Sequence, residues 1–239
     1  MSYAFFQPLI EFLLPLLLAV AAIMTRALDY KGIIAGLALA YITLVTQNVF
    51  WLIILLGFFV VATWATRCKE KRKLRYKTEK QRIRTVKHVL ANGSIAVIMA
   101  VLAYHYSNPL FFFGFIGALA TATADTLSSE IGMISSKAPR LVTTFKRVPT
   151  GTEGAVSLLG TTAAIAAAAF IGVLGLLVFN SYHVVVIATV VGVAGCFIDS
   201  FVGATLETKK YVKNWGTNLI ATTSGGLLGV MLSLFWLYM

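Results

Sequence analysis

All 20 lysine and arginine residues of the chain lie in links between apolar segments, and only in every second link. The basic links are residues 26–31, 67–87, 137–155 and 209–213. The links without a basic residue are 47–48, 107–108 and 180–183, and both chain ends also have none. Because cytoplasmic loops of membrane proteins are enriched in Lys and Arg, this alternation predicts that the four basic links face the cytoplasm. Both termini are then expected outside.

The apolar segments have the length of membrane-spanning helices, which need ~20 residues. We distinguish eight of them, at residues 8–25, 32–47, 49–66, 89–105, 109–131, 156–179, 183–205 and 216–238. The chain is 59% hydrophobic and only 12% charged, which is about half the charged fraction of a soluble domain. We therefore expect an all-α integral membrane protein with about eight transmembrane helices, forming one polytopic domain over residues 1–239.

The second half of the sequence has features of a tandem repeat. Segments 109–131 and 183–205 run in the same predicted direction, and each carries an aspartate, Asp125 or Asp199, followed by Thr or Ser. Each leads through a basic link to a returning segment that begins with Thr, Ser or Gly residues. Repeats of the same orientation occur in many membrane proteins, so the sequence favours a duplication here.

Small and polar residues form a stripe on each of these two segments. The first stripe consists of Gly114, Gly117, Thr121, Asp125, Ser128, Ser129 and Gly132. The second consists of Gly192, Gly195, Asp199, Gly203 and Glu207. Residues at steps of three and four share one face of a helix, and small residues let two helices approach closely in lipid. If the stripes face each other, the two aspartates meet.

Two carboxylates that face each other in a medium of low dielectric require a cation between them or a shared proton. Oxygen ligands suit a hard cation such as Mg²⁺, so the pair predicts metal or phosphate chemistry with Asp125 and Asp199 as metal ligands. The alternative is helix packing, with each aspartate bonded to a hydroxyl or backbone donor. Glu130 lies about 140° around the helix from Asp125, which leaves both a metal ligand and an interfacial residue open for it.

The basic link after the first stripe has the residues that phosphate binding needs. Lys146 and Arg147 precede a turn rich in Gly and Thr that opens a helix, and free N–H groups at such a start favour anions. Residues 132–155 are therefore a predicted phosphate-binding loop, although no Walker A motif is present and a plain topology signal is the alternative. The residues expected to contact nucleotide are Thr150, Gly151, Thr152, Gly154, Ser157, Asn218, Thr222 and Asn92.

The segment of residues 67–88 holds most of the excess positive charge, which is +11 for the whole chain. Three interpretations are open: a topology anchor on anionic lipid, steering of an anionic substrate, and nucleic-acid binding. The distribution of charge among links favours the lipid anchor, and we expect a basic cytosolic segment with no nucleic acid as a partner.

Several of these residues form motifs that resemble the integral-membrane family that contains the plant phytyl-phosphate kinase, long catalogued as a domain of unknown function. The specific block is residues 124–132, 139–144 and 148–161, with further likeness at residues 89–93, 199–205 and 218–226. Remoter similarity, through Asp125, Gly132 and residues 151–154, is to dolichol and phytol kinases. The stretch at residues 153–155 departs from the Gly-richer sequence expected there.

The resemblance implies a phosphotransferase that uses CTP to convert an isoprenyl monophosphate to its diphosphate. In that reading Asp125, Asp199 and Glu130 bind Mg²⁺, and Lys146 and Arg147 hold the nucleotide phosphates. The expected partners are isoprenyl monophosphate, nucleotide and membrane lipid, and an oligomer is left open. A multi-pass protein of the cell membrane with a cytoplasmic active site is expected if the source is a prokaryote. The alternatives are a secondary transporter with an acid-lined site between duplicated helices, and a scaffold without chemistry.

Overall fold

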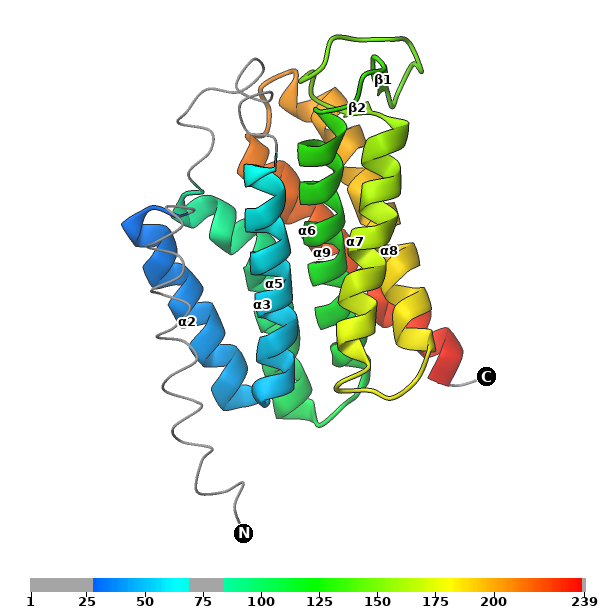
Figure 1. Ribbon diagram of the computed structural model, residues 1–239. Helices are drawn as coiled ribbons and strands as arrows, with labels where there is room; N and C mark the ends of the chain where they lie inside the picture. The colour runs from blue at the N-terminus through cyan, green and yellow to red at the C-terminus, as the bar shows by residue number, and fades with distance from the viewer. Residues whose placement is uncertain (1–27, 69–83, 238–239) are drawn as a thin grey trace.

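The computed structural model describes residues 28–68 and 84–237, and this part of the chain is an assembly of helices (Figure 1). The helices are α2 (Tyr30–Thr46), α3 (Val49–Arg67), α5 (Val86–Tyr106), α6 (Leu110–Gly132), α7 (Leu158–Gly175), α8 (His183–Val202) and α9 (Asn214–Leu237). A π-helical turn, η2 (Gly203–Glu207), continues α8. Two short strands, β1 (Arg140–Leu141) and β2 (Ala155–Val156), lie in the link between α6 and α7.

Each predicted apolar segment from residue 32 onward corresponds to one of these helices. The largest difference is at the end of the predicted segment 156–179, because α7 already ends at Gly175 and a turn follows. Six of the described helices are long and apolar enough to cross a membrane, whereas α2 is shorter at 17 residues. The all-α membrane class is thus confirmed. The first predicted segment lies outside the described residues, so the count of eight and the position of the termini stay predictions.

Side-chain caps set where three of the helices begin. The Asp29 carboxylate accepts from the Gly32 N–H at 2.6 Å at the start of α2. Asn48 and Ser157 cap α3 and α7 in the same way, by accepting from Phe50 N at 2.9 Å and Gly160 N at 3.0 Å. Each cap satisfies a backbone donor that has no partner within its own helix.

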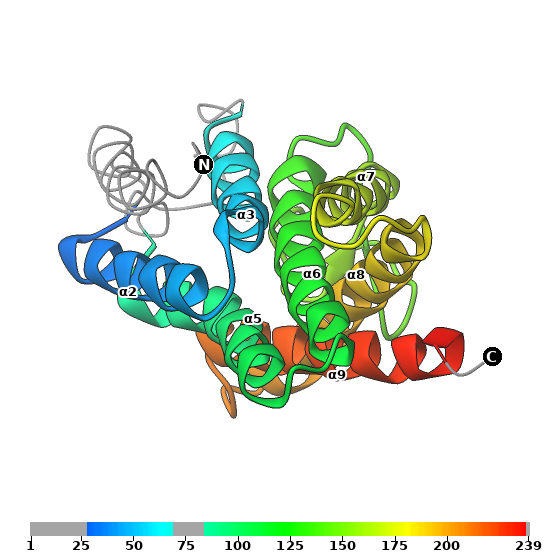
Figure 2. The same cartoon turned by 90° about the horizontal axis from the view of Figure 1, so that it is seen from below.

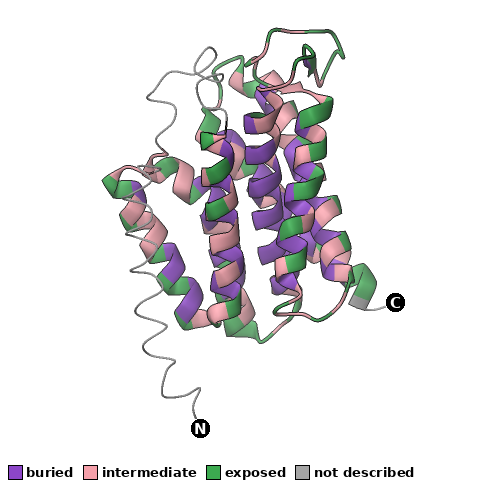
Figure 3. Cartoon of the chain, in the orientation of Figure 1, coloured by how far each residue is buried: buried purple, intermediate pink, exposed green. Residues whose placement is uncertain are grey.

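Helix α6 is the central element of the described fold. Figure 2 shows it between α3, α5, α7, α8 and α9, and Figure 3 shows it buried along most of its length. In its most apolar window 83% of the residues are buried, against 33–39% in the other spanning helices. A polar residue on α6 is therefore shielded by protein on most sides rather than exposed to lipid.

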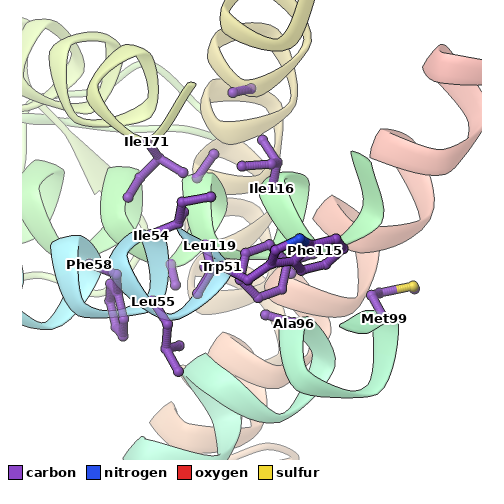
Figure 4. Close-up of a cluster of buried hydrophobic side chains, with 14 of the residues drawn as sticks. Trp51, Ile54, Leu55, Phe58, Ala96, Met99, Phe115, Ile116, Leu119 and Ile171 are labelled. Atoms are coloured by element: carbon purple, nitrogen blue, oxygen red, sulfur yellow. The ribbon is translucent and has the colours of Figure 1, made fainter. Parts of the chain in front are cut away.

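The apolar core extends along α6 from Phe112 to Ala124, and the aromatic side chains that α6 contributes to it lie toward the start of the helix. The core joins Trp51, Ile54, Leu55 and Phe58 of α3 to residues of α5, α6 and α7 (Figure 4). The Trp51 ring centroid lies 4.7 Å from that of Phe115 and 5.0 Å from that of Phe112. Aromatic rings at such distances pack favourably, so this end of the assembly is a solid apolar layer.

Glycines bring α8 and α9 into direct contact with α6. A methyl group at Gly195 of α8 would overlap the Thr121 side chain, and one at Gly117 would overlap the Gly225 carbonyl oxygen of α9. The Thr121 hydroxyl also donates to the Val191 carbonyl oxygen at 3.4 Å. The small-residue stripes of α6 and α8 therefore face each other, and the two helices run side by side in the same direction.

The link between α6 and α7 folds back over the end of the helices, at the top of Figure 1. Its strands pair antiparallel with Arg140 opposite Val156 and Leu141 opposite Ala155. These strands are an addition to the all-α prediction. Gly154, at φ 72°, lies against Ser200 and Ala204 at the end of α8, and this contact fixes the loop over the cavity described next.

Candidate functional site

A polar cavity of ≈ 240 Å³ lies beneath this loop, between α5, α6, α8 and α9. It gathers most of the residues that the sequence singles out as a site. Those in its lining are Asn92, Asp125, Glu130, Thr150, Gly151, Thr152, Gly154, Ser157, Asp199 and Asn218. These residues come from segments that are far apart in the sequence, and the helix packing brings them to one place.

The carboxyl groups of Asp125 and Asp199 lie within hydrogen-bonding reach of each other in this cavity. Oδ1 of Asp199 is buried and has no hydrogen-bond partner among the described residues. Glu153 of the loop adds a further carboxylate near Asp199. This concentration of negative charge favours a bound cation, because like charges in a shielded site repel unless one is neutralised.

The residues present fit a magnesium ion held by two protein ligands. No three His, Cys, Asp or Glu side chains within residues 28–68 and 84–237 are grouped closely enough to hold a metal by themselves. Mg²⁺ at nucleotide sites is often held by one or two carboxylates, with phosphate oxygens and water completing the shell. The unsatisfied Asp199 oxygen and its neighbour Asp125 match that donor set.

Glu130, the third predicted ligand, lines the same cavity and is only 5% exposed. Its charge acts on the Arg84 guanidinium, so in this conformation Glu130 faces a cation of the protein. Its role as a metal ligand stays a prediction.

Arg84 is a cavity residue that the sequence analysis did not single out. Burial lowers the pKa of its guanidinium, while the nearby charges of Glu130 and Asp125 act in the opposite direction; arginine nevertheless stays charged in proteins. Arg84, His88 and Asn92 are spaced by four and all line the cavity, but Arg84 precedes α5, which begins at Val86, so the helical repeat does not place it there. Arg84 also belongs to a long run of basic residues, and no local pattern distinguishes it from its neighbours.

The loop residues contribute a compact turn to the cavity wall. Gly151 has φ 90°, and the following Thr152 donates both its N–H and its hydroxyl to the Pro149 carbonyl oxygen, at 3.2 and 2.8 Å. The Thr152 N–H is therefore already hydrogen-bonded within the turn. In this conformation it does not point to a phosphate, as the sequence predicts that it would. The Ser157 hydroxyl caps α7 and lies beside Gly132.

Three predicted site residues are not in the cavity lining. Lys146 and Arg147 are exposed on the outer part of the loop. Thr222 is 1% exposed, and its hydroxyl donates to the Ala91 carbonyl oxygen at 2.8 Å, which joins α9 to α5. The wall that Thr222 was expected to share is made by Asn218, whose Nδ2 donates to Oδ1 of Asn92 at 3.3 Å.

This placement gives Thr222 a packing role that a substitution can test. Replacing Thr222 with valine removes one buried interhelical hydrogen bond, so we expect a loss of about 1 kcal/mol in the free energy of unfolding. Nucleotide affinity should be unchanged, because the hydroxyl points at Ala91 rather than into the cavity. Thermal unfolding in detergent and the KM for nucleotide test the two parts, and a large rise in KM without loss of stability would contradict this role.

Comparison with known proteins gives one family and several relatives. The family described as integral membrane protein DUF92 matches residues 13–229. Membrane protein MJ0933 of Methanocaldococcus jannaschii is 39% identical over 220 residues, which are 91% of this chain and 92% of the relative. Arabidopsis thaliana has two relatives: the chloroplastic protein VTE6, 29% identical (89% of this chain, 67% of the relative), and protein PGR, 31% identical (80% and 76%). No solved structure matches the chain.

Proposed function

The chain belongs to the DUF92 family of integral membrane proteins, and we propose that it is a membrane-embedded kinase that converts an isoprenyl monophosphate to its diphosphate with CTP as the donor. The observation that carries the proposal is the pair of apposed carboxylates, Asp125 and Asp199, beneath a glycine-containing loop in a polar cavity. The motif resemblance to the family that contains the plant phytyl-phosphate kinase supports the same reaction class.

The proposed reaction requires little acid–base catalysis from the protein. An oxygen of the isoprenyl monophosphate attacks the γ-phosphorus of CTP, the bond from that phosphorus to the β–γ bridging oxygen breaks, and CDP leaves. The acceptor oxygen is already anionic, so no general base is needed. Such a transfer is accelerated mainly by positioning of the reactants and by stabilisation of their charge. The cavity has carboxylates that can bind a metal and Arg84, which can bind a phosphate.

We assign Asp125 and Asp199 to Mg²⁺, with Glu130 as an additional ligand when nucleotide is bound. When bound, the ion neutralises phosphate charge and draws the reacting groups together. The N–H groups of Gly151 and Gly154 and the amides of Asn92 and Asn218 are assigned to the phosphates and the nucleotide, because all four residues line the cavity. Thr150 and Ser157 complete the loop side of the site.

Lys146 and Arg147, exposed outside the cavity, are assigned to the capture of nucleotide. Replacing both with glutamine should raise the KM for CTP severalfold at low ionic strength and leave kcat unchanged. The difference should shrink as salt is added, because exposed charges are screened. Initial rates at two salt concentrations provide the measurement. A fall in kcat that does not depend on salt would instead place these residues in direct contact with the reacting phosphates.

We further propose that the protein lies in a cell membrane, with eight spans and both termini outside. The cavity then faces the cytoplasm. The support is the confinement of all 20 Lys and Arg residues to alternate links, including the loop above the cavity. Nucleotide is then available on the side where the loop lies.

The proposed function is tested by phosphate transfer from Mg²⁺–CTP to phytyl or geranylgeranyl monophosphate, with detergent-purified protein and mass spectrometry of the lipid product. We expect the diphosphate, and none in the presence of a chelator that removes Mg²⁺. If folded protein forms no product with any nucleotide, the kinase proposal is wrong. Substrate-driven uptake into liposomes without nucleotide consumption would then identify a transporter.

A further inference from the structure

An apolar groove of ≈ 90 Å³ lies between α2, α3 and α5. Its walls are aliphatic and aromatic, with Ile33, Leu37, Leu39, Leu55, Leu56 and Phe59 among the lining residues. The polar residues in the lining are Arg84, His88 and Asn92, and these three also line the polar cavity. The groove and the cavity therefore meet at these side chains, which separate an apolar space from the carboxylate pair.

The chain holds this junction in place through contacts on both sides. The Arg84 carbonyl oxygen accepts from the Asp29 N–H at 3.2 Å, so the backbone of Arg84 is tied to the start of α2. One ring nitrogen of His88 is bonded to the Thr85 hydroxyl at 3.0 Å. Asn92 is bonded to Asn218 of α9 across the cavity. The backbone of Arg84 is thus fixed where α2, one wall of the groove, meets the cavity.

We propose, on the basis of the kinase function proposed above, that this groove receives the isoprenoid tail of the acceptor and that Arg84 binds its monophosphate. The two halves of such a substrate differ as the two spaces do: a branched hydrocarbon chain joined directly to a small dianion. A guanidinium binds phosphate by paired, charge-assisted hydrogen bonds. A monophosphate bound to Arg84 faces the cavity that contains Asp125. The hydrocarbon chain extends from it into the apolar groove, away from the polar cavity.

The size of the groove limits how much of the tail it holds. At ≈ 90 Å³ it is smaller than the ≈ 240 Å³ cavity, so we assign to it the isoprene units next to the phosphate, with the remaining chain in lipid. Gly36 of α2 lies in the lining, and a Cβ there would meet only Leu28 Cδ1, at 3.9 Å. A larger side chain at residue 36 would therefore occupy the groove without displacing the backbone.

The first test maps the tail directly and does not depend on catalysis. Full-length protein is photolabelled with a geranylgeranyl monophosphate analogue that carries a diazirine on the first isoprene unit, and labelled peptides are identified by mass spectrometry. We expect labels on α2, α3 and α5, which excess geranylgeranyl monophosphate removes at a lower concentration than geranylgeraniol does. Labels confined to α7, α8 or α9 would overturn the proposal even if the protein is an active kinase, and labels in the groove would support it even if no diphosphate forms.

Matched variants test the groove and its cation separately. Gly36→Leu should weaken competition by geranylgeranyl monophosphate at least about tenfold, because filling the groove excludes roughly two CH₂ groups or more from burial. Ala38→Leu is the control, since Ala38 is exposed on the same helix and absent from the groove lining. Arg84→Gln should weaken competition by geranylgeranyl monophosphate more than competition by geranylgeraniol. Equal effects of Gly36→Leu and Ala38→Leu, or equal effects of Arg84→Gln on the two lipids, would overturn the assignment.

Discussion

Replacing Asp125 with asparagine is expected to lower kcat for diphosphate formation by about 10³-fold while the protein stays folded. Asparagine has nearly the same shape, so the contact of α6 with α8 is preserved. The change removes one of the two apposed carboxylates and with it the charge that holds Mg²⁺ against the nucleotide. Removing one preorganised group that stabilises transition-state charge costs 10²–10³ in rate in well-studied enzymes, and loss of a metal ligand belongs at the upper end.

Two comparisons separate this effect from general damage. Asp199→Asn should reduce kcat to a similar extent, because both carboxylates serve the same ion. Glu207→Gln should change kcat little, since Glu207 is outside the cavity lining and accepts from the Thr217 hydroxyl at 3.0 Å. Neither aspartate variant should unfold at a lower temperature than the wild type without metal, because each relieves repulsion between buried charges. Normal turnover by folded Asp125→Asn would exclude the metal assignment.

The sequence predicts the helices well because lipid imposes a simple rule on them. A backbone that crosses a membrane must satisfy its own hydrogen bonds, so apolar length and basic links determine where α3 and α5–α9 lie, within a few residues at most ends. The steps of three and four also predict the meeting of Asp125 and Asp199, because a helix repeats its faces regularly. Nothing comparable fixes the loop over the cavity, where turns and a two-residue strand pair decide which groups face inward.

That difference explains which site residues the sequence misplaces. Lys146 and Arg147 stand before the glycine turn, but the pairing of β1 with β2 and the main-chain bridge between Arg140 and Arg147 keep them on the outside. Thr222 shares a helix face with Asn218, yet its hydroxyl is taken by the neighbouring helix. Arg84 reaches the cavity because its backbone joins the start of α2, a contact between distant segments that no local pattern reveals.

The second large effect is expected at Gly154, where the loop meets α8. Its φ of 72° costs an alanine about 1–2 kcal/mol, and a Cβ there would lie 2.6 Å from the Ala204 backbone nitrogen and 2.5 Å from the Ser200 carbonyl oxygen. Backbone atoms inside a helix cannot yield as a flexible side chain does. Gly154→Ala must therefore lift the loop away from α8 and open the cavity above Asp199.

We expect Gly154→Ala to lower kcat/KM by about 10²-fold, the usual cost of misplacing a positioned group by about 1 Å. Gly151→Ala is the comparison for the backbone cost, because Gly151 also has a positive φ, 90°, but is exposed. Since Gly151 lines the cavity as well, both variants should lose some activity, and only Gly154→Ala adds the clash with α8. Steady-state kinetics should therefore show a several-fold larger loss of kcat/KM for Gly154→Ala than for Gly151→Ala, and thermal unfolding in detergent checks that both variants are folded. Equal activities would mean that contact between the loop and α8 is not what closes the site over its substrates.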